Sequence, residues 1–378
     1  MRILKGETTF DFVGKTKAFS VLSGAVLTIS ILAIGMLGLN FGIDFAGGYE
    51  IQVGFGKRVS EPEIKTALGG IGLKDLRVQR FGAEEENEYL ILVREQGTVT
   101  EAQKTDMRQA FETLAGGADK LLNWAIAESG ERVSVGFSEP ITEAQVRSVV
   151  TKFGLEVKGV TQGDRADRPD YQVDVVSMAD KVGAALTGEF SAPAGGQIVK
   201  RVEFVGPQVG RELQNQGLMA IIYALGFILF YIAVRFDFAF APGAVVALIH
   251  DVLILVGVFA VFQLEFNLPI IAAILALVGY SLNDTIVVYD RIRENGIRLR
   301  GRPIRDLVNT SINQTMSRTL LTSFTTLLVV GALLVFGGGI IRDFSIALCV
   351  GIIVGTYSSV AVAAPVYIHL RERAARTA

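Results

Sequence analysis

The alternation of apolar and polar positions divides the chain into six long apolar segments and one long mixed region. Each apolar segment has roughly the 17–25 residues that a helix needs to cross a bilayer. The segments cover residues 18–39, 218–234, 240–262, 268–288, 320–336 and 344–368. The pattern therefore predicts an α-helical polytopic membrane protein with six transmembrane helices and a large domain, residues 40–215, between the first two.

The basic residues near the ends of the spans predict the orientation, because such residues are enriched on the cytoplasmic side. If the helices alternate, Arg235 and the basic segments 1–17, 289–319 and 369–378 all fall on one side. The short loops of the other face hold only Glu265 and the neighbours Arg342 and Asp343. We therefore expect both termini in the cytoplasm, a cytoplasmic loop and the start of the fifth helix at 289–319, and a periplasmic domain at 40–215. No small-residue cleavage site follows the first span, so we expect it to remain as an anchor.

The domain between the first two spans repeats itself at a constant offset of 82 residues. Residues 51–55 match 133–137, residues 59–61 match 141–143, and Tyr89 matches Tyr171. Each copy, about 49–130 and about 131–206, has the strand and helix order βαββαβ, which is ferredoxin-like. We expect the second helix of the two copies at about 101–114 and 177–190, and the last strand near 121–127 and 198–205. We predict a duplicated α+β ferredoxin-like domain; the alternative is two unrelated segments that share a pattern. The open face of such a sheet would suit either a polypeptide or a partner protein.

Polar residues inside the fourth and fifth spans are the main functional signal. Asp284 and its neighbour Asn283 lie in the fourth span, and Arg318 follows 34 positions after Asp284, where the fifth span opens. An ionisable side chain at a helix centre costs roughly 2.5–3.5 kcal/mol on insertion scales, so it usually marks a functional site. A carboxylate beside a guanidinium suits a proton relay that is coupled to helix movement. The alternative is a structural ion pair that fixes the register of the helices.

The third span carries two further candidates, His250 and Asp251, midway along its length. We assign them as secondary members of the relay, together with Asn283. The alternative for His250 is a structural role, in which its ring nitrogens are satisfied by a neighbouring helix. A lone membrane carboxylate would suit sodium as well as a proton, so the sequence leaves the coupling ion open.

Composition narrows the functional classes. Half of the residues are hydrophobic, the mean hydropathy is +0.43, and charged residues still make up 20%. A net charge of -2 gives no support for a nucleic-acid partner. Cys349 is the only cysteine and there are two histidines, so we expect neither a disulfide framework nor a metal site. With no nucleotide-binding glycine loop and no catalytic constellation, we expect a protein that is not an enzyme and has no cofactor, with the proton as coupling ion.

Four motifs carry a resemblance to a known family. They are residues 41–48 (FGIDFAGG), 203–210 (EFVGPQVG), 279–295 (GYSLNDTIVVYDRIREN) and 311–319 (SINQTMSRT). Together they resemble SecF, the smaller membrane subunit of the bacterial SecDF protein-export complex, within the resistance–nodulation–division superfamily. The family resemblance implies structural or turn roles for Asp44, Gly47 and Gly48 in the first motif and for Gly206 and Pro207 in the second.

The resemblance also implies the partners and the activity. A SecF-like chain is half of a twelve-helix unit that it forms with SecD beside the SecYEG channel in the inner membrane, with YajC as a further partner and unfolded preprotein on the periplasmic side. The family uses the proton-motive force to promote preprotein translocation after or alongside ATP-driven insertion. Asp284 and Arg318 match the family's proton path, whose third member would be a SecD aspartate.

Two alternatives and one departure accompany this interpretation. The chain could be half of a small-molecule exporter of the same superfamily, or a passive scaffold that stabilises the channel. SecF usually has one compact domain between its first two spans, and here the interval is longer by about one repeat. A duplication of that domain explains the excess.

Overall fold

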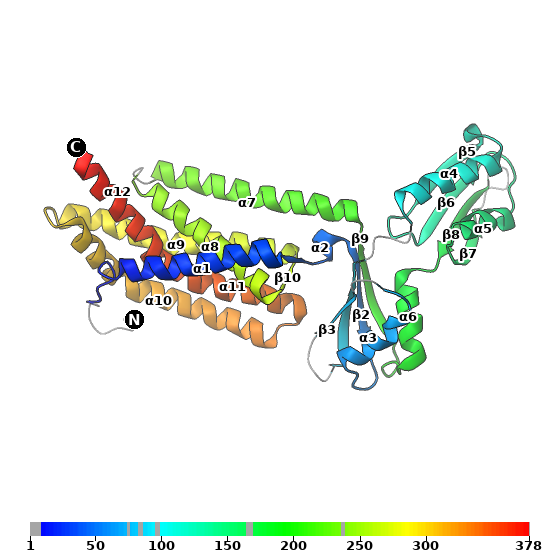
Figure 1. Cartoon of the computed structure of the whole chain (residues 1–378), viewed down its shortest axis with the longest axis horizontal. Helices are drawn as coiled ribbons and strands as arrows, with labels where there is room; N and C mark the ends of the chain where they lie inside the picture. Colours follow the sequence, from blue (N-terminus) through cyan, green and yellow to red (C-terminus); the bar gives the residue numbers. More distant parts are fainter. Residues whose placement is uncertain are drawn as a thin grey trace. The chain divides into compact units, whose positions relative to one another are not determined.

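The computed structural model describes residues 9–73, 76–81, 86–94, 99–163, 169–235 and 239–377. The chain forms two compact units, which are described separately (Figure 1): Met1–Gly42 with Gln214–Ala378, called here the helical unit, and Ile43–Leu213, called the sheet unit. Residues 1–8 and 378 of the predicted cytoplasmic termini lie outside the described residues.

The helical unit confirms the predicted class of fold. In the described part of the chain, six stretches of helix are long and apolar enough to cross a membrane. Its helices are α1 (Thr16–Leu37), α7 (Pro207–Arg235, which begins in the sheet unit), α8 (Ala241–Phe262), α9 (Leu268–Arg298), α10 (Ile304–Phe336), α11 (Gly339–Ser358), a π-helical turn (Ser359–Ala363) and α12 (Ala364–Thr377). Several of these helices extend beyond the apolar segments predicted from the sequence, because their backbone hydrogen bonds continue into polar sequence. A two-strand pairing, β1 (Asn40–Phe41) with β10 (Glu265–Phe266), joins two of the connecting segments.

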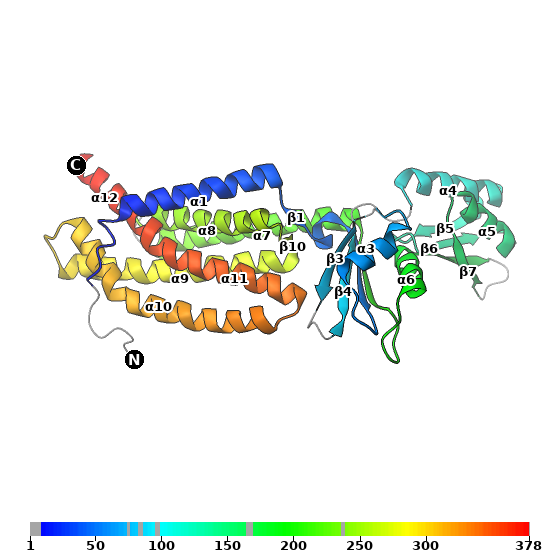
Figure 2. The ribbon, with the colours of Figure 1, turned by 60° about the horizontal axis from the view of Figure 1, so that its bottom comes forward.

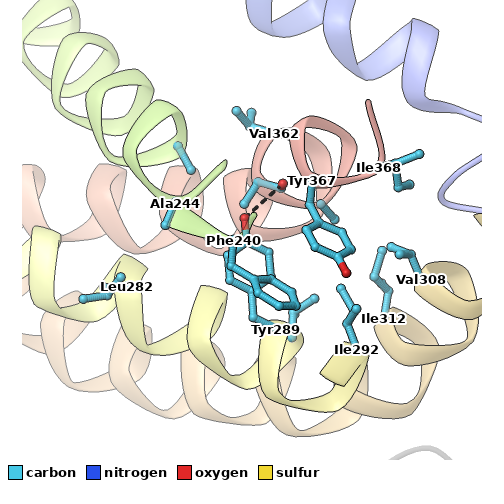
Figure 3. Close-up of a cluster of buried hydrophobic side chains, with 14 of the residues drawn as sticks. Phe240, Ala244, Leu282, Tyr289, Ile292, Val308, Ile312, Val362, Tyr367 and Ile368 are labelled. Carbon is cyan, nitrogen blue, oxygen red and sulfur yellow. Dashed lines mark hydrogen bonds between the residues drawn. The ribbon is translucent and has the colours of Figure 1, made fainter. Parts of the chain in front are cut away.

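An aromatic cluster holds one end of the helical unit together (Figure 3). The rings of Phe240 and Tyr367 are stacked with centroids 4.3 Å apart, and Tyr289 packs against Phe240 at 4.8 Å. The Tyr289 hydroxyl donates a 3.1 Å hydrogen bond to the carbonyl of Ala363, the last residue of the π turn. A Cβ at Gly243 would lie 2.2 Å from that hydroxyl, so glycine is needed at this crossing.

The basic ends of the helices gather at the same end of this unit. Figure 2 shows the start of α1, the α9–α10 connection and the end of α12 together. Arg305 near the start of α10 donates two hydrogen bonds to Glu372 on α12, at 2.7 and 3.1 Å. Asn309 and Asn313 of α10 hydrogen-bond the backbone of residues 10–13 ahead of α1. Asn309 and Asn313 therefore hold the segment ahead of α1 against the start of α10.

The sheet unit contains two four-stranded antiparallel sheets. Its elements are α2 (Ile43–Ala46), β2 (Gly48–Gly54), α3 (Glu61–Gly69), β3 (Leu76–Phe81), β4 (Glu88–Val93), α4 (Glu101–Ala115), the short helix Ala118–Lys120, β5 (Leu121–Ile126), β6 (Arg132–Phe137), α5 (Glu143–Lys152), β7 (Val157–Gln162), β8 (Asp170–Val175), α6 (Met178–Glu189) and β9 (Val199–Val205). The strand orders are β3-β4-β2-β9 and β5-β6-β8-β7. Each sheet packs against two helices.

The internal repeat is visible in side-chain contacts as well as in element order. Tyr89 on β4 donates a hydrogen bond to the carbonyl of Val59, and Tyr171 on β8 donates one to the carbonyl of Ile141. Both bonds connect residues 30 positions apart. The same tyrosine thus closes the same loop in each copy, which favours duplication over two unrelated segments.

The assignment of the last helix and strand of each copy is wrong, however. We expected copy one to end with a strand near 121–127 and copy two with a strand near 198–205. In the structure β5 belongs to the second sheet and β9 to the first, and their helices move with them. Met107 and Phe111 of α4 are buried in the core of the second sheet, while Val182 and Leu186 of α6 are buried in the core of the first. The boundaries 49–130 and 131–206 therefore do not separate the two cores.

A short turn explains this exchange. The Ala127 amide donates to the Arg132 carbonyl at 2.9 Å and the Gly130 amide to the Ala127 carbonyl at 2.8 Å, which makes a tight connection between β5 and β6. Closing such a short loop costs little chain entropy, so β5 pairs with the strand that follows it. Strand β9 instead pairs with β2, with Val205 opposite Gly48.

A capping residue in the second core gives a prediction about stability. Thr100 caps α4 and accepts a 3.3 Å hydrogen bond from the Gln103 amide. We expect Thr100→Ala to lower the free energy of unfolding of this core by about 1 kcal/mol. Trp124, the only tryptophan, lies 5.4 Å from the ring of Phe111 on α4, so its fluorescence follows denaturant unfolding of this core in the full chain. Thr113→Ala, at an exposed position in the last turn of α4, is the control and should change little; equal effects would contradict the capping role.

Candidate functional site

The glycine motif of residues 41–48 forms a tight turn at the start of β2. Gly47 and Gly48 have φ angles of +75° and +127°, which side chains rarely adopt. A Cβ at Gly48 would lie 2.4 Å from the Val93 carbonyl oxygen, and one at Gly47 would lie 3.1 Å from Cα of Pro207. Asp44 is half-buried in the first turn of α2.

The second motif meets the first at this turn. Gly206 follows β9, and Pro207 is the first residue of α7, where a missing amide hydrogen is harmless. A Cβ at Gly210 would lie 2.9 Å from the carbonyl oxygen of Phe45, so α7 approaches the α2 backbone closely. The two motifs therefore have a common structural task, which is to bring the β2–β9 pair and the start of α7 together.

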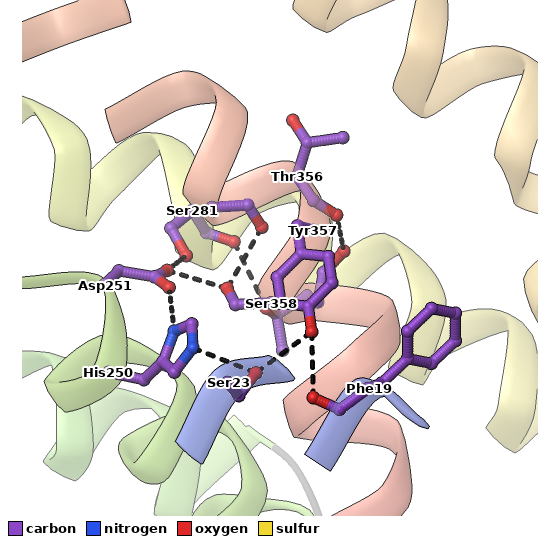
Figure 4. A network of polar contacts seen from close by, with 11 residues as sticks. Phe19, Ser23, His250, Asp251, Ser281, Thr356, Tyr357 and Ser358 are labelled. Carbon is purple, nitrogen blue, oxygen red and sulfur yellow. Dashed lines mark hydrogen bonds and ion pairs between the residues drawn. The ribbon is translucent and has the colours of Figure 1, made fainter. Parts of the chain in front are cut away.

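His250 and Asp251 lie at the centre of a connected polar cluster in the helical unit (Figure 4). Both side chains are almost fully buried, with 3% and 1% of their surface exposed. Nδ1 of His250 lies 2.9 Å from Oδ1 of Asp251. The other carboxylate oxygen of Asp251 accepts hydrogen bonds from the hydroxyls of Ser281 on α9 at 2.5 Å and Ser358 on α11 at 2.7 Å. Burial of a charge is tolerated where it is paired and hydrogen-bonded in this way.

The cluster continues to α1 through His250. Its Nε2 lies 3.2 Å from the Ser23 hydroxyl, which lies 3.0 Å from the hydroxyl of Tyr357. Tyr357 in turn donates a 3.1 Å hydrogen bond to the carbonyl of Phe19. A continuous series of polar contacts therefore connects four helices: α1, α8, α9 and α11.

Asp284 lies in a second, smaller cluster on the neighbouring turn of α9. Its side chain is buried, with 2% exposed, and among the described residues its one hydrogen bond is a long one of 3.5 Å from the Thr356 hydroxyl. Thr356 also lies 2.7 Å from the hydroxyl of Ser323 on α10, which accepts a 3.2 Å hydrogen bond from Tyr280. The carboxylate therefore has few donors for a buried charge.

The structure does not pair Asp284 with Arg318. Arg318 is near enough to attract the carboxylate electrostatically, but the two side chains form no ion pair, and Arg318 is exposed on the surface of the helical unit. Asn283 is exposed as well. The alternative considered for these residues, a structural ion pair within this chain, is therefore wrong, and the proton relay stays a prediction. Neighbouring helical positions point in different directions, so Asn283 faces outward while Asp284 faces the interior.

Three consecutive residues of α11 connect these clusters, and sequence reasoning did not single them out. Thr356 contacts Asp284, Tyr357 contacts α1, and Ser358 contacts Asp251, directly before the π turn. The signal was present, because residues 356–359 are a run of four hydroxyl-bearing residues inside the sixth span. Ser23 had no comparable signal. In the described part of the chain, no three His, Cys, Asp or Glu side chains gather to hold a metal ion.

Comparison with known proteins identifies the family. Two family models match: "Protein export membrane protein SecD/SecF, C-terminal" at residues 190–373, and "SecD/SecF GG Motif" at residues 32–57. The "Protein translocase subunit SecF" of Koribacter versatilis is 39% identical over 383 residues, covering 97% of this chain and 92% of that protein. The chain belongs to the SecF family. The GG motif of the family is the Gly47–Gly48 turn described above.

Other members show the same extent of similarity. SecF subunits of Calditerrivibrio nitroreducens and Vibrio alginolyticus are 35% and 36% identical, covering 96% and 98% of this chain and 94% and 92% of those proteins. Each of these relatives is therefore similar to this chain over nearly its whole length.

Solved structures show the same fold. A crystal structure of SecDF from Thermus thermophilus has a TM-score of 0.68 and 29% identity, and it covers 99% of this chain. A crystal structure of SecDF in a super-membrane-facing form has a TM-score of 0.57 and 30% identity over the whole of this chain. In both cases the chain spans 40% of the length of the SecDF chain that it matches. This SecF-family chain is thus similar to one part of a longer SecDF protein.

Proposed function

We propose that this chain works with SecD as a proton-driven subunit of the protein translocase in the bacterial inner membrane. In this proposal it promotes preprotein translocation through SecYEG, after or alongside ATP-driven insertion, with unfolded preprotein on the periplasmic side and YajC as a further partner. Both termini lie in the cytoplasm. The clustering of the basic helix ends at one end of the helical unit supports this orientation, because basic residues favour the cytoplasmic side.

The observation that carries the proposal is the division of polar residues between the inside and the outside of the unit. Asp284 is buried with a single long hydrogen bond, while Arg318 and Asn283 are exposed on helices that cross the membrane. An arginine facing hydrocarbon is expensive, roughly 2.5–3.5 kcal/mol on insertion scales, and such residues usually face protein or water. A second membrane subunit that covers this face, with a carboxylate opposite Arg318, would relieve that cost and complete the proton site.

Coupling follows from charge. Protonation of Asp284 would remove its attraction to Arg318, and a proton that crosses the bilayer releases about 2.3 kcal/mol per 100 mV. Asp284 and Arg318 are the proposed relay, with Asn283, Asp251 and His250 as secondary members. A change in the protonation of Asp284 would be felt by the sixth span, because α11 contacts the carboxylates of Asp284 and Asp251 immediately before its π turn.

The test is preprotein translocation into vesicles that hold this chain, SecD and SecYEG, energised in turn by ATP alone, by ATP with a proton gradient and by ATP with a sodium gradient. We expect stimulation by the proton gradient only, and only when the SecD complex is present. Equal stimulation by the sodium gradient would show that sodium can serve as the coupling ion in place of the proton. No stimulation by either ion from an intact complex would favour a passive scaffold, and a homodimer that exports small molecules would favour the exporter alternative.

A further inference from the structure

The hydroxyl hydrogens around His250 have one arrangement that satisfies their contacts (Figure 4). Tyr357 donates its only hydroxyl hydrogen to the carbonyl of Phe19. The 3.0 Å contact between Ser23 and Tyr357 is therefore donated by Ser23. Since Ser23 has then used its hydrogen, its 3.2 Å contact with His250 requires a hydrogen on Nε2.

The same accounting fixes the charge of the His250–Asp251 pair. Nδ1 and Oδ1 are 2.9 Å apart, so one hydrogen lies between them. With Nε2 also protonated, the pair is either imidazolium with carboxylate or neutral imidazole with carboxylic acid. The net charge of the pair is zero in both descriptions.

The other carboxylate oxygen, Oδ2 of Asp251, has two hydroxyl neighbours, and one of them can change from donor to acceptor. The hydroxyls of Ser281 and Ser358 both donate to it. Ser358 also lies 3.1 Å from the carbonyl oxygen of Gly355, so its hydrogen has a second acceptor to which it can turn. Among the described contacts, the Ser281 hydroxyl has no such second acceptor. Only Ser358 can therefore exchange the role of donor for that of acceptor.

We propose that Asp251 is a proton-binding site that is complete within this chain. Oδ2 takes up a proton and donates it in a hydrogen bond to Ser358, while Ser358 turns its own hydrogen to the Gly355 carbonyl. One O–H bond forms on Asp251, no hydrogen bond is lost, and the pair changes from net charge zero to +1. The inference rests on the proposed proton-driven function. It gives Asp251, a secondary member of the proposed relay, a proton site of its own that needs no residue of SecD.

His250 also borders an open groove on the surface of the helical unit. Ser23 and His250 line this groove of about 370 Å³ together with mostly apolar side chains of α1, α8, the π turn and α12. The series of contacts from Ser23 through His250 to Asp251 connects the groove with the carboxylate.

Few charged groups face the His250–Asp251 pair. From α11, Tyr357 is the titratable neighbour, with its ring centroid 6.2 Å from that of His250. From α9 the nearest carboxylate is Asp284, three residues beyond Ser281, and α1 contributes the uncharged Ser23. A proton on Asp251 is thus sensed through Ser358 by the same part of α11 that contacts Asp284.

Infrared difference spectroscopy of the complete complex in lipid, between alkaline and acidic buffer, tests the site. We expect a carboxylic acid band on acidification that is lost in Asp251→Asn. In Ser358→Ala the band should move, because the acid hydrogen has lost its acceptor. Ser281→Ala removes the other hydroxyl from the same oxygen and is the matched control, with a smaller shift. Absence of any Asp251-dependent band, or equal shifts in the two serine variants, would overturn the proposal.

A second measurement reads the imidazole directly. The chain has two histidines, so His369→Gln leaves His250 as the only one, and its ring nitrogens can be followed by ¹⁵N NMR. We expect Nε2 to be protonated in both buffers. An unprotonated Nε2 would contradict the hydrogen accounting and with it the site.

These outcomes are separable from failure of the proposed function. The infrared band and the ¹⁵N shifts do not depend on translocation. A complex that responds to the proton gradient but shows no Asp251 band would reject this site alone. A band at Asp251 in a complex that ignores the gradient would reject the proton-driven function and keep the site.

Discussion

Replacement of Gly48 by alanine is expected to destabilise the sheet unit by about 2–6 kcal/mol. The residue has a φ of +127°, and the strain of such a conformation costs about 1–3 kcal/mol for a residue with a side chain. The new Cβ would also lie 2.4 Å from the Val93 carbonyl, a backbone atom of the central strand β4 that cannot move alone. Overpacking of this kind typically costs a further 1–3 kcal/mol or so.

Hydrogen exchange of the backbone amides of β2 and β4 in the full chain measures this effect. Protection in both strands should fall in Gly48→Ala. Gly70→Ala is the control, because Gly70 has an ordinary helical φ of -69° and no atom within 4 Å of a new Cβ. Unchanged protection in the first variant would show that the turn can relax, and that the glycine motif is not required by the fold.

Replacement of Asp251 by alanine is expected to have an effect of similar size on the helical unit. Removing one partner of a buried pair costs about 3–5 kcal/mol, because the other partner is left buried without compensation. Here His250 would lose its partner, and the hydroxyls of Ser281 and Ser358 would lose their shared acceptor. The thermal midpoint of the detergent-solubilised chain should fall steeply.

The matched comparison is Asp284→Ala, at a carboxylate that is equally buried but accepts only one long hydrogen bond. Its thermal midpoint should fall much less. If both substitutions lowered the midpoint equally, the contrast between a satisfied and a poorly satisfied carboxylate would be wrong.

Much of the fold could be predicted from the sequence because it depends on local patterns. The length of an apolar run decides whether a helix can cross a membrane, so the spans are readable one at a time. The repeat was equally readable from its constant offset. Which sheet receives β5 or β9 is different, because the offset is the same whether or not the copies exchange their last elements. The tight turn at residues 127–132 decided this, and its effect is on pairing between strands rather than on periodicity.

The candidate site shows a similar division. Charges inside apolar spans identified His250, Asp251, Asp284 and Arg318 as unusual. Their partners could not be predicted, because Asp251 collects hydroxyls from helices far apart in the chain and Arg318 turns to the outside. Sequence order says little about which helices become neighbours or which face of a helix is covered.

The proton-driven role of Asp284 is the central claim, and translocation by the Asp284→Asn complex tests it most directly. Asparagine keeps the size of the side chain but has no carboxylate that could bind and release a proton. Preprotein entry into vesicles is measured with and without a proton-motive force, after SecD has been shown to copurify. We expect the ATP-driven part to remain and the force-dependent part to be lost. Full force-dependent stimulation by an intact Asp284→Asn complex would contradict the account.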